Sequence, residues 1–341
     1  MTAGDRRQVA AWLFVCAAFT FAMVVVGGIT RLTESGLSIV EWQPILGALP
    51  PLSQADWEAL FAQYRETPQY QKVFSEIGLE GFKSIFWWEY AHRLLGRTIG
   101  LVFLLPFSFF LFKKKLSKPL AWKLGGLFVL GGLQGAMGWY MVKSGLVDDP
   151  RVSHFRLTAH LGLALLIFSA EIWLALEVLK GGSKKNPIAL IVAGVVFLMA
   201  LSGGFVAGLR AGRAYNTFPL MNGQLVPQDI LLLEPWWRNF LWNVATVQFV
   251  HRAFFWLLAI LVPVLWFKTR NTSAKIAAHH LLGMFILQAS LGISTLLLAV
   301  PIPLAAMHQA GAVLLLACAL WTAQASSTST PSTANIAAAM R

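Results

Sequence analysis

The sequence contains few charged residues and almost no cysteine. Of its 341 residues only 12% are charged, whereas 57% are hydrophobic. A composition this poor in charge excludes an ordinary soluble domain and any intrinsically disordered class. The two cysteines, Cys16 and Cys318, both fall inside apolar runs, and their spacing excludes a loop disulfide or a shared metal site. We expect both to be small residues of the core.

Long hydrophobic runs make up most of the chain, and the mean hydropathy is +0.64. A helix needs about 20 apolar residues to cross a bilayer, and in runs of this length only helices satisfy their own backbone in lipid. We therefore predict an all-α integral membrane protein with eight transmembrane helices. The first run lacks a small-residue cleavage site, which favours a retained span over a signal peptide. The predicted spans cover residues 11–29, 88–112, 120–142, 155–179, 188–209, 241–267, 277–299 and 303–324.

Acidic residues are scarce, with 15 Asp and Glu against 27 Lys and Arg. The basic residues precede the first span and gather between spans two and three, four and five, and six and seven, whereas the alternate loops hold most of the acids. The positive-inside rule then predicts cytoplasmic termini and places loops 30–87, 143–154 and 210–240 outside. The net charge of +12 mostly reflects this bias. No soluble basic face accompanies it, so we expect no nucleic-acid partner.

One stretch combines ionisable groups with the start of a long apolar helix. It runs Glu89-Tyr90-Ala91-His92-Arg93-Leu94-Leu95-Gly96-Arg97. Ionisable groups are costly at the edge of a membrane and are functional candidates by default. Glu89 and His92 share a helix face, and Gly96 and Gly100 leave room there for a flat ligand. The alternative is a helix cap whose histidine is satisfied by a neighbour.

The second half of the chain repeats the first in outline. Each half has four predicted spans, an even number, so the halves insert the same way up around an axis along the membrane normal. We predict a first half over residues 1–182 with the long outer loop 30–87, a second half over 183–326, and a flexible cytoplasmic tail over 327–341. The repeated segments pair Gly27-Gly28 with Gly203-Gly204, Glu89–Arg93 with Gln248–Arg252, Gln134–Gly138 with Gln288–Gly292, and the surroundings of His160 with those of His308.

The repeat gives each half two histidines at matched depth near the outer face, His92 with His160 and His251 with His308. Zinc normally takes four ligands, and no cysteines or further carboxylates are grouped to complete such a site. Two histidines from facing helices of a four-helix bundle suit a heme iron held on both axial sides. We predict two heme sites, with buried structural histidines or a proton path as alternatives. Arginines near the outer edge are candidates to pair with propionates; they are Arg31, Arg93, Arg97, Arg210 and Arg252.

The halves differ at one decisive position, because Glu89 of the first half corresponds to Gln248 of the second. A carboxylate beside a porphyrin edge can accept a proton or stabilise developing positive charge, and an amide cannot accept that proton. We therefore predict that Glu89 is catalytic and that the second half transfers electrons. The competing interpretation is that Glu89 only fixes an arginine or a histidine nitrogen.

Two other segments are expected to be structural. The glycines of the third span, such as Gly131 and Gly135, are expected to allow close helix packing, and Gln134 is a candidate for a hydrogen bond across helices. In the outer loop, Ser53 and Asp56 give a helix-start signal. The helix that follows is expected to cover the site.

With these motifs in hand, the sequence resembles the heme A synthase family of cytochrome oxidase assembly over nearly its whole length. The resemblance rests on residues 27–38, on Glu89-x-x-His92-Arg93, on His160, and on the His251-Arg252 and His308 repeat. Some relatives carry a cysteine pair in the first outer loop. This chain has none there, so it resembles the cysteine-free branch of proteobacteria and mitochondria, and a thiol-based electron route is excluded.

The resemblance implies oxidation of the methyl group of heme O to the formyl group of heme A. It implies heme O as substrate in the first half and a heme b cofactor in the second, with no zinc and no nucleotide. It also implies a bacterial inner membrane protein with heme sites near the periplasmic face. The expected partners are the enzyme that makes heme O, an electron acceptor in the membrane and, in a homo-oligomer, further copies of the chain.

Two other classes of membrane protein share parts of this pattern. A diheme b-type electron carrier or quinol oxidoreductase also needs paired histidines, but it usually places hemes near both faces. A transporter could share the two-fold repeat. That class predicts charges or broken helices near the middle of the membrane, which the sequence does not contain in matched positions.

Overall fold

The computed structural model describes residues 1–341 except 44–45, 147–149, 151, 181–184 and 326–341. The described residues form helices and loops, without a strand. The long helices of this part of the chain are α1 (Ala3–Leu32), α4 (Leu79–Phe112), α5 (Lys118–Gly145), α6 (His154–Lys180), α7 (Pro187–Gly208), α9 (Val244–Thr269), α10 (Lys275–Leu297) and α11 (Ile302–Ala325). The short ones are α2 (Gln54–Arg65), α3 (Pro68–Val73) and α8 (Asn239–Trp242).

The prediction of an all-α membrane protein with several spans is confirmed. Within the described residues, seven helices are long and apolar enough to cross a membrane. The long helix that falls outside this set is α5, which is rich in glycine, so the count of eight spans stays a prediction. The predicted tail 327–341, the boundary at residue 182 and part of loop 143–154 lie outside the described residues.

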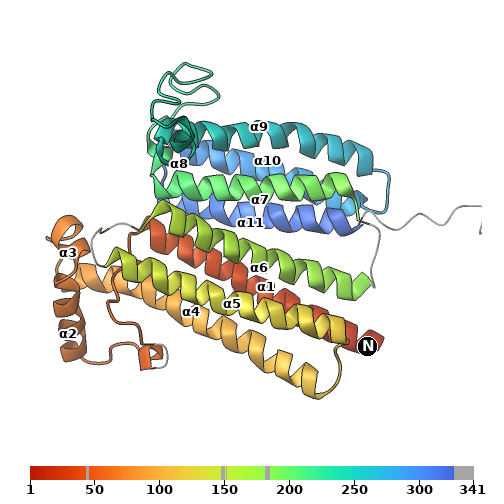
Figure 1. Ribbon diagram of the computed structural model, residues 1–341, viewed down its shortest axis with the longest axis horizontal. Helices are drawn as coiled ribbons and strands as arrows, with labels where there is room; N and C mark the ends of the chain where they lie inside the picture. The colour runs from red at the N-terminus through yellow and green to blue at the C-terminus, as the bar shows by residue number, and fades with distance from the viewer. Residues whose placement is uncertain (44–45, 147–149, 151, 181–184, 326–341) are drawn as a thin grey trace, which may run out of the picture.

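The long helices form two groups of four that lie side by side (Figure 1). In the first group α1 packs against α4 and α6, and α5 packs against α6. In the second group α7 packs against α9 and α11, and α10 packs against α11. The same pairs of helices therefore meet in both groups. The groups contact each other through α1, α6, α7 and α11.

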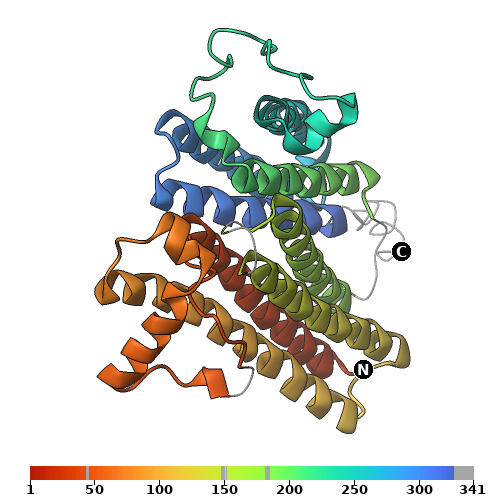
Figure 2. The same cartoon turned by 60° about the vertical axis from the view of Figure 1, so that its left-hand side comes forward.

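The starts of α4, α6, α9 and α11 all lie at one end of the molecule, together with α2 and α3 (Figures 1 and 2). The helix-start signal in this region is confirmed, because Ser53 and Asp56 form a reciprocal capping box at α2. The hydrogen bonds from Ser53 lower the pKa of the Asp56 carboxyl. Beyond the cap, Tyr64 of α2 stacks on Phe82 of α4 at 5.2 Å between ring centroids. This aromatic cluster fixes the outer segment to the start of the helix that carries His92.

Candidate functional site

Each of the four predicted histidines lies against a glycine of the neighbouring helix. A Cβ added to Gly27 of α1 would lie 2.8 Å from Cε1 of His92, and one added to Gly138 of α5 would lie 3.1 Å from Cε1 of His160. In the second group Gly203 of α7 meets His251 and Gly292 of α10 meets His308 in the same way, at 3.3 and 2.7 Å. Glycine at these positions leaves room for the imidazole rings beside the adjacent helix.

Each group of helices contains the two histidines of one predicted pair: His92 on α4 with His160 on α6, and His251 on α9 with His308 on α11. Within the described part of the chain, no hydrogen bond engages Nε2 of these four rings. A free imidazole nitrogen is a ready metal ligand, and a heme needs only two axial ligands because the porphyrin supplies the rest. Two imidazoles in each group of helices are therefore available as ligands of a heme iron.

The other ring nitrogen distinguishes the four histidines. Among the described residues, Nδ1 of His92, His160 and His308 is buried without a hydrogen-bond partner. Nδ1 of His251 lies 2.8 Å from Oγ of Ser202 on α7. A histidine that binds a metal through Nε2 usually donates its other ring N–H to a partner. In the described part of the chain, His251 is the one ring of the four whose Nδ1 has such a partner.

The predicted hydrogen bond of Gln134 across helices is confirmed. Its amide donates to the carbonyl of His160 at 3.0 Å. The matching Gln288 donates to the carbonyl of His308 at 2.9 Å. In both groups an amide thus fixes the backbone that carries the second histidine of the pair.

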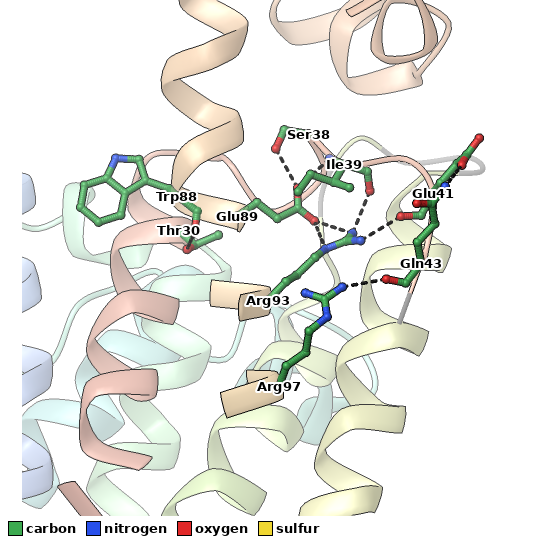
Figure 3. Close-up of polar contacts among 9 residues, drawn as sticks. All are labelled: Thr30, Ser38, Ile39, Glu41, Gln43, Trp88, Glu89, Arg93 and Arg97. Carbon is green, nitrogen blue, oxygen red and sulfur yellow. Dashed lines mark hydrogen bonds and ion pairs between the residues drawn. The ribbon is translucent and has the colours of Figure 1, made fainter. Parts of the chain in front are cut away.

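Glu89 lies at the centre of a hydrogen-bonded cluster at the start of α4 (Figure 3). The residue is 2% exposed. Its Oε2 accepts from the hydroxyl of Ser38 and the amide of Ile39, each at 2.8 Å. Its Oε1 accepts from Nη2 of Arg93 at 2.6 Å and from Nε at 3.0 Å. The contact with Arg93 is the one expected if Glu89 only fixes an arginine.

Arg93 also binds the outer segment directly, because it donates to the carbonyls of Ile39 at 2.7 Å and Glu41 at 3.0 Å. The second half uses the matching pair for the same purpose. Gln248 donates to the carbonyl of Ala211 at 3.0 Å, and Arg252 donates to the carbonyls of Tyr215 and Thr217, each at 2.8 Å. In both halves, two residues hold the loop above the site by hydrogen bonds. One lies three residues before the histidine and the other lies one residue after it.

The chain is similar to known proteins over most of its length. The family model of the cytochrome oxidase assembly protein matches residues 10–320. The chain belongs to this family. It is 58% identical to the heme A synthase of Nitrosospira multiformis, over 93% of this chain and 92% of the relative. It is 53% identical to the heme A synthase of Nitrosomonas eutropha, over 93% of each chain. The heme A synthase of Parvibaculum lavamentivorans is 48% identical, over 94% of each chain.

In this member of the family, the candidate propionate arginines make varied contacts. Arg93 and Arg252 hold loop carbonyls, and Arg97 donates to the carbonyl of Gln43 at 2.8 Å. Arg31 donates to the carbonyl of Ala207 at 3.2 Å, and Arg210 forms an ion pair with Glu34. Both of these last contacts join residues 176 apart, which is also the offset between Gly27 and Gly203. Arg31 and Arg210 therefore link the two halves at equivalent positions.

The expected room beside Gly96 and Gly100 is present, because a Cβ at Gly100 would meet no atom within 4 Å and one at Gly96 would meet only the end of Met23. The glycines that contact the histidines lie on the neighbouring helices, and these contacts were not predicted. The expected packing role of the third-span glycines is wrong for Gly131 and Gly135, because a Cβ there would meet no atom within 4 Å. Ser202 was missed, although its place directly before Gly203, where the first half has Val26, is visible in the repeat.

Proposed function

We propose that the chain is a heme A synthase, an oxidoreductase that converts the methyl group of heme O to the formyl group of heme A for cytochrome c oxidase. Family membership and the names of relatives that match more than nine-tenths of the chain support this activity. The structural observation that carries it is the repeated pair of imidazoles, each ring against a glycine and each with an unengaged Nε2.

The first half is proposed to bind the substrate. His92 and His160 would hold the iron of heme O through Nε2, and Gly27 and Gly138 set the position of the two rings. The cluster of Glu89, Arg93 and Ser38 closes the outer end of this site. It holds the outer segment against α4, and the segment in turn excludes water from the reacting edge of the substrate.

Glu89 is proposed to act on the reaction as a buried negative charge. Oxidation of a methyl group to a formyl group withdraws electrons and releases protons at the porphyrin edge, and the added oxygen atom comes from water or dioxygen. A carboxylate fixed by four hydrogen bonds is preorganised to stabilise positive charge that develops near it. The matching Gln248 carries no charge, yet it still ties down its loop. Loop attachment alone therefore does not account for a carboxylate in the first half.

The second half is proposed to bind heme b as a cofactor between His251 and His308. Bound there, heme b supplies one-electron redox chemistry. Ser202 orients His251, and Gln288 fixes the backbone of His308. Because the two halves pack along α1, α6, α7 and α11, His251 and His308 would hold this cofactor in the same chain as the proposed substrate site.

The protein is proposed to cross a bacterial inner membrane eight times, with both termini in the cytoplasm. Its site is proposed to lie near the periplasmic face. The starts of the four histidine-bearing helices lie at one end of the molecule, as this orientation requires. The enzyme that makes heme O is the proposed source of the substrate.

Pigment analysis of the purified protein tests the function. Hemes are extracted from protein produced in cells that make heme O, and each is identified by hemochrome spectra and mass. We expect heme b together with heme O, its oxidised intermediates and heme A. A protein that holds only heme b, whatever the supply of heme O, is a diheme electron carrier, and that result would contradict the proposal.

A further inference from the structure

The second half contains an aromatic pair just below its histidine site. Phe255 follows His251 by four residues, one turn further into the membrane on α9. Its ring lies nearly parallel to that of Phe285 on α10, with 6.1 Å between centroids and 15° between planes. Phe285 is only 8% exposed and belongs to the core. The two rings fill the space between α9 and α10.

The first half has glycine at both matching positions. Gly96 follows His92 by four residues, as Phe255 follows His251. Gly131 precedes Gln134 by three residues, as Phe285 precedes Gln288. The two glutamines occupy equivalent sites, because each donates to the carbonyl of the second histidine in its half. Two large rings of the second half are therefore absent from the same place in the first.

The space beside these glycines is open. A Cβ added to Gly131, Gly135 or Gly100 would meet no atom within 4 Å, and one added to Gly96 would meet only the flexible end of Met23, at 3.2 Å. Gly131 and Gly135 are exposed, whereas Phe285 is buried. α4 also packs less closely against α5 than α9 does against α10, so the open space is reached from the side of the molecule, between α4 and α5.

This space continues the substrate site. Gly131 lies seven residues, or about two turns, before Gly138 on α5, so both glycines lie on one face of that helix. Gly138 is the residue against which His160 packs. The face of α5 that carries the open glycines therefore runs from His160 to the edge of the bundle that faces lipid.

We propose that this lateral opening holds the long isoprenoid side chain of heme O, and that Phe255 and Phe285 exclude such a chain from the second half. The inference rests on the proposed function and extends it to the choice of ligand by each half. Heme O carries an isoprenoid chain that heme b lacks. A chain of this kind needs an apolar path beside its porphyrin, and it can extend into lipid without cost to the fold. Filled with aromatic rings, the second half accepts only the tail-less porphyrin.

A Gly131→Phe variant tests the proposal by placing in α5 the residue that α10 carries. The matched control is Gly126→Phe, because Gly126 is also open but points to a different side of α5. We expect heme O and its products bound to Gly131→Phe to fall about tenfold or more, while the control stays close to wild type. Heme b in the second half reports that each variant has folded. If Gly131→Phe also loses heme b, Gly131→Leu tests the same space with a smaller side chain.

Titration of the purified variants with heme b and with heme O separates the tail from the porphyrin. We expect the first site of Gly131→Phe to accept added heme b but not heme O. If it retains heme O like wild type, or rejects both hemes equally, the tail path is refuted while the proposed function stands. If wild type itself never holds heme O or its products, the proposed function fails instead.

Discussion

The hydroxyl oxygen of Ser202 lies 2.8 Å from Nδ1 of His251 and donates a hydrogen bond to the carbonyl of Met199 at 2.7 Å. The matching residue of the first half is Val26, which has no polar side-chain atom, and among the described residues Nδ1 of His92 is buried without a partner. One histidine of the proposed cofactor site is therefore held by a hydrogen bond to its ring, and its counterpart in the proposed substrate site is not. A permanent cofactor benefits from a fixed ligand, whereas a substrate must bind and leave.

Ser202→Ala is expected to weaken the binding of heme b and to raise its midpoint potential. With Nε2 on iron, Nδ1–H donates to Ser202, and this bond makes the imidazole a stronger donor to the oxidised metal. Loss of such a partner typically costs about 10- to 100-fold in metal affinity. Redox titration and heme titration measure both effects. Ser290→Ala is the control, because Ser290 bonds only to the carbonyl of Ile286 on its own helix. An unchanged potential and affinity would show that Ser202 does not tune the heme.

Glu89→Gln is expected to retain both hemes but to stop formyl production, because the neutral amide cannot stabilise positive charge at the porphyrin edge. Mass analysis of bound pigment should then find heme O without heme A. Ser38→Ala is the control: it removes one hydrogen bond to Glu89 and leaves the carboxylate charged. Heme A production that stops equally in both variants would assign Glu89 to loop positioning alone. Normal production in Glu89→Gln would remove the residue from the mechanism.

His308→Ala and His251→Ala are each expected to abolish the b-type absorption spectrum, since either change removes an axial ligand of the proposed cofactor. His160→Ala should instead preserve that spectrum and lose bound heme O. The control is His279→Ala on α10, whose Nδ1 lies 2.7 Å from the carbonyl of Lys275 in its own helix. Absorption spectra with heme extraction distinguish these outcomes, and a b-type spectrum that survives both substitutions would refute the cofactor assignment.

Alanine at the glycines beside the rings is expected to disturb one site at a time. Gly292→Ala places a Cβ 2.7 Å from Cε1 of His308, and Gly27→Ala places one 2.8 Å from Cε1 of His92. Each ring must shift by several tenths of an ångström, because such contacts are too close for carbon atoms. We expect Gly292→Ala to alter the heme b spectrum and Gly27→Ala to reduce only bound heme O.

Gly283→Ala is the control for this pair, because its Cβ would meet no atom within 4 Å. Its spectrum and pigment content should match those of wild type. If Gly292→Ala changes heme O and leaves heme b untouched, the assignment of the two halves must be reversed.

Much of the helical architecture could be predicted from hydrophobic length, because a chain with these apolar runs has no other way to satisfy its backbone in lipid. Several helices, among them α1, α4 and α6, extend beyond the predicted spans at both ends or at the start. The span predicted at residues 88–112, for example, belongs to a helix that begins at Leu79. Its first turns are polar enough to lie outside the membrane, where the aromatic cluster around Phe82 stabilises them. Hydropathy alone does not predict these aromatic contacts or the extra turns that they stabilise.

The repeat was equally informative about the candidate site. It singled out four of the seven histidines and assigned two of them to each half. It did not show what surrounds them. Gly27 meets His92, and Gly138 meets His160, only because of how neighbouring helices are rotated and paired. The stacking of Phe255 on Phe285 is a contact of the same kind.

The sequence by itself therefore determined that the chain is helical, lies in a membrane and carries paired histidines at matched depth, because these properties follow from composition and spacing along one chain. The tertiary structure decided which glycines hold the imidazoles, that Glu89 is bound by Arg93 and Ser38, and that one half is open where the other is filled. Those contacts join residues far apart in sequence, and they depend on helix rotation and side-chain packing, which periodicity leaves undefined.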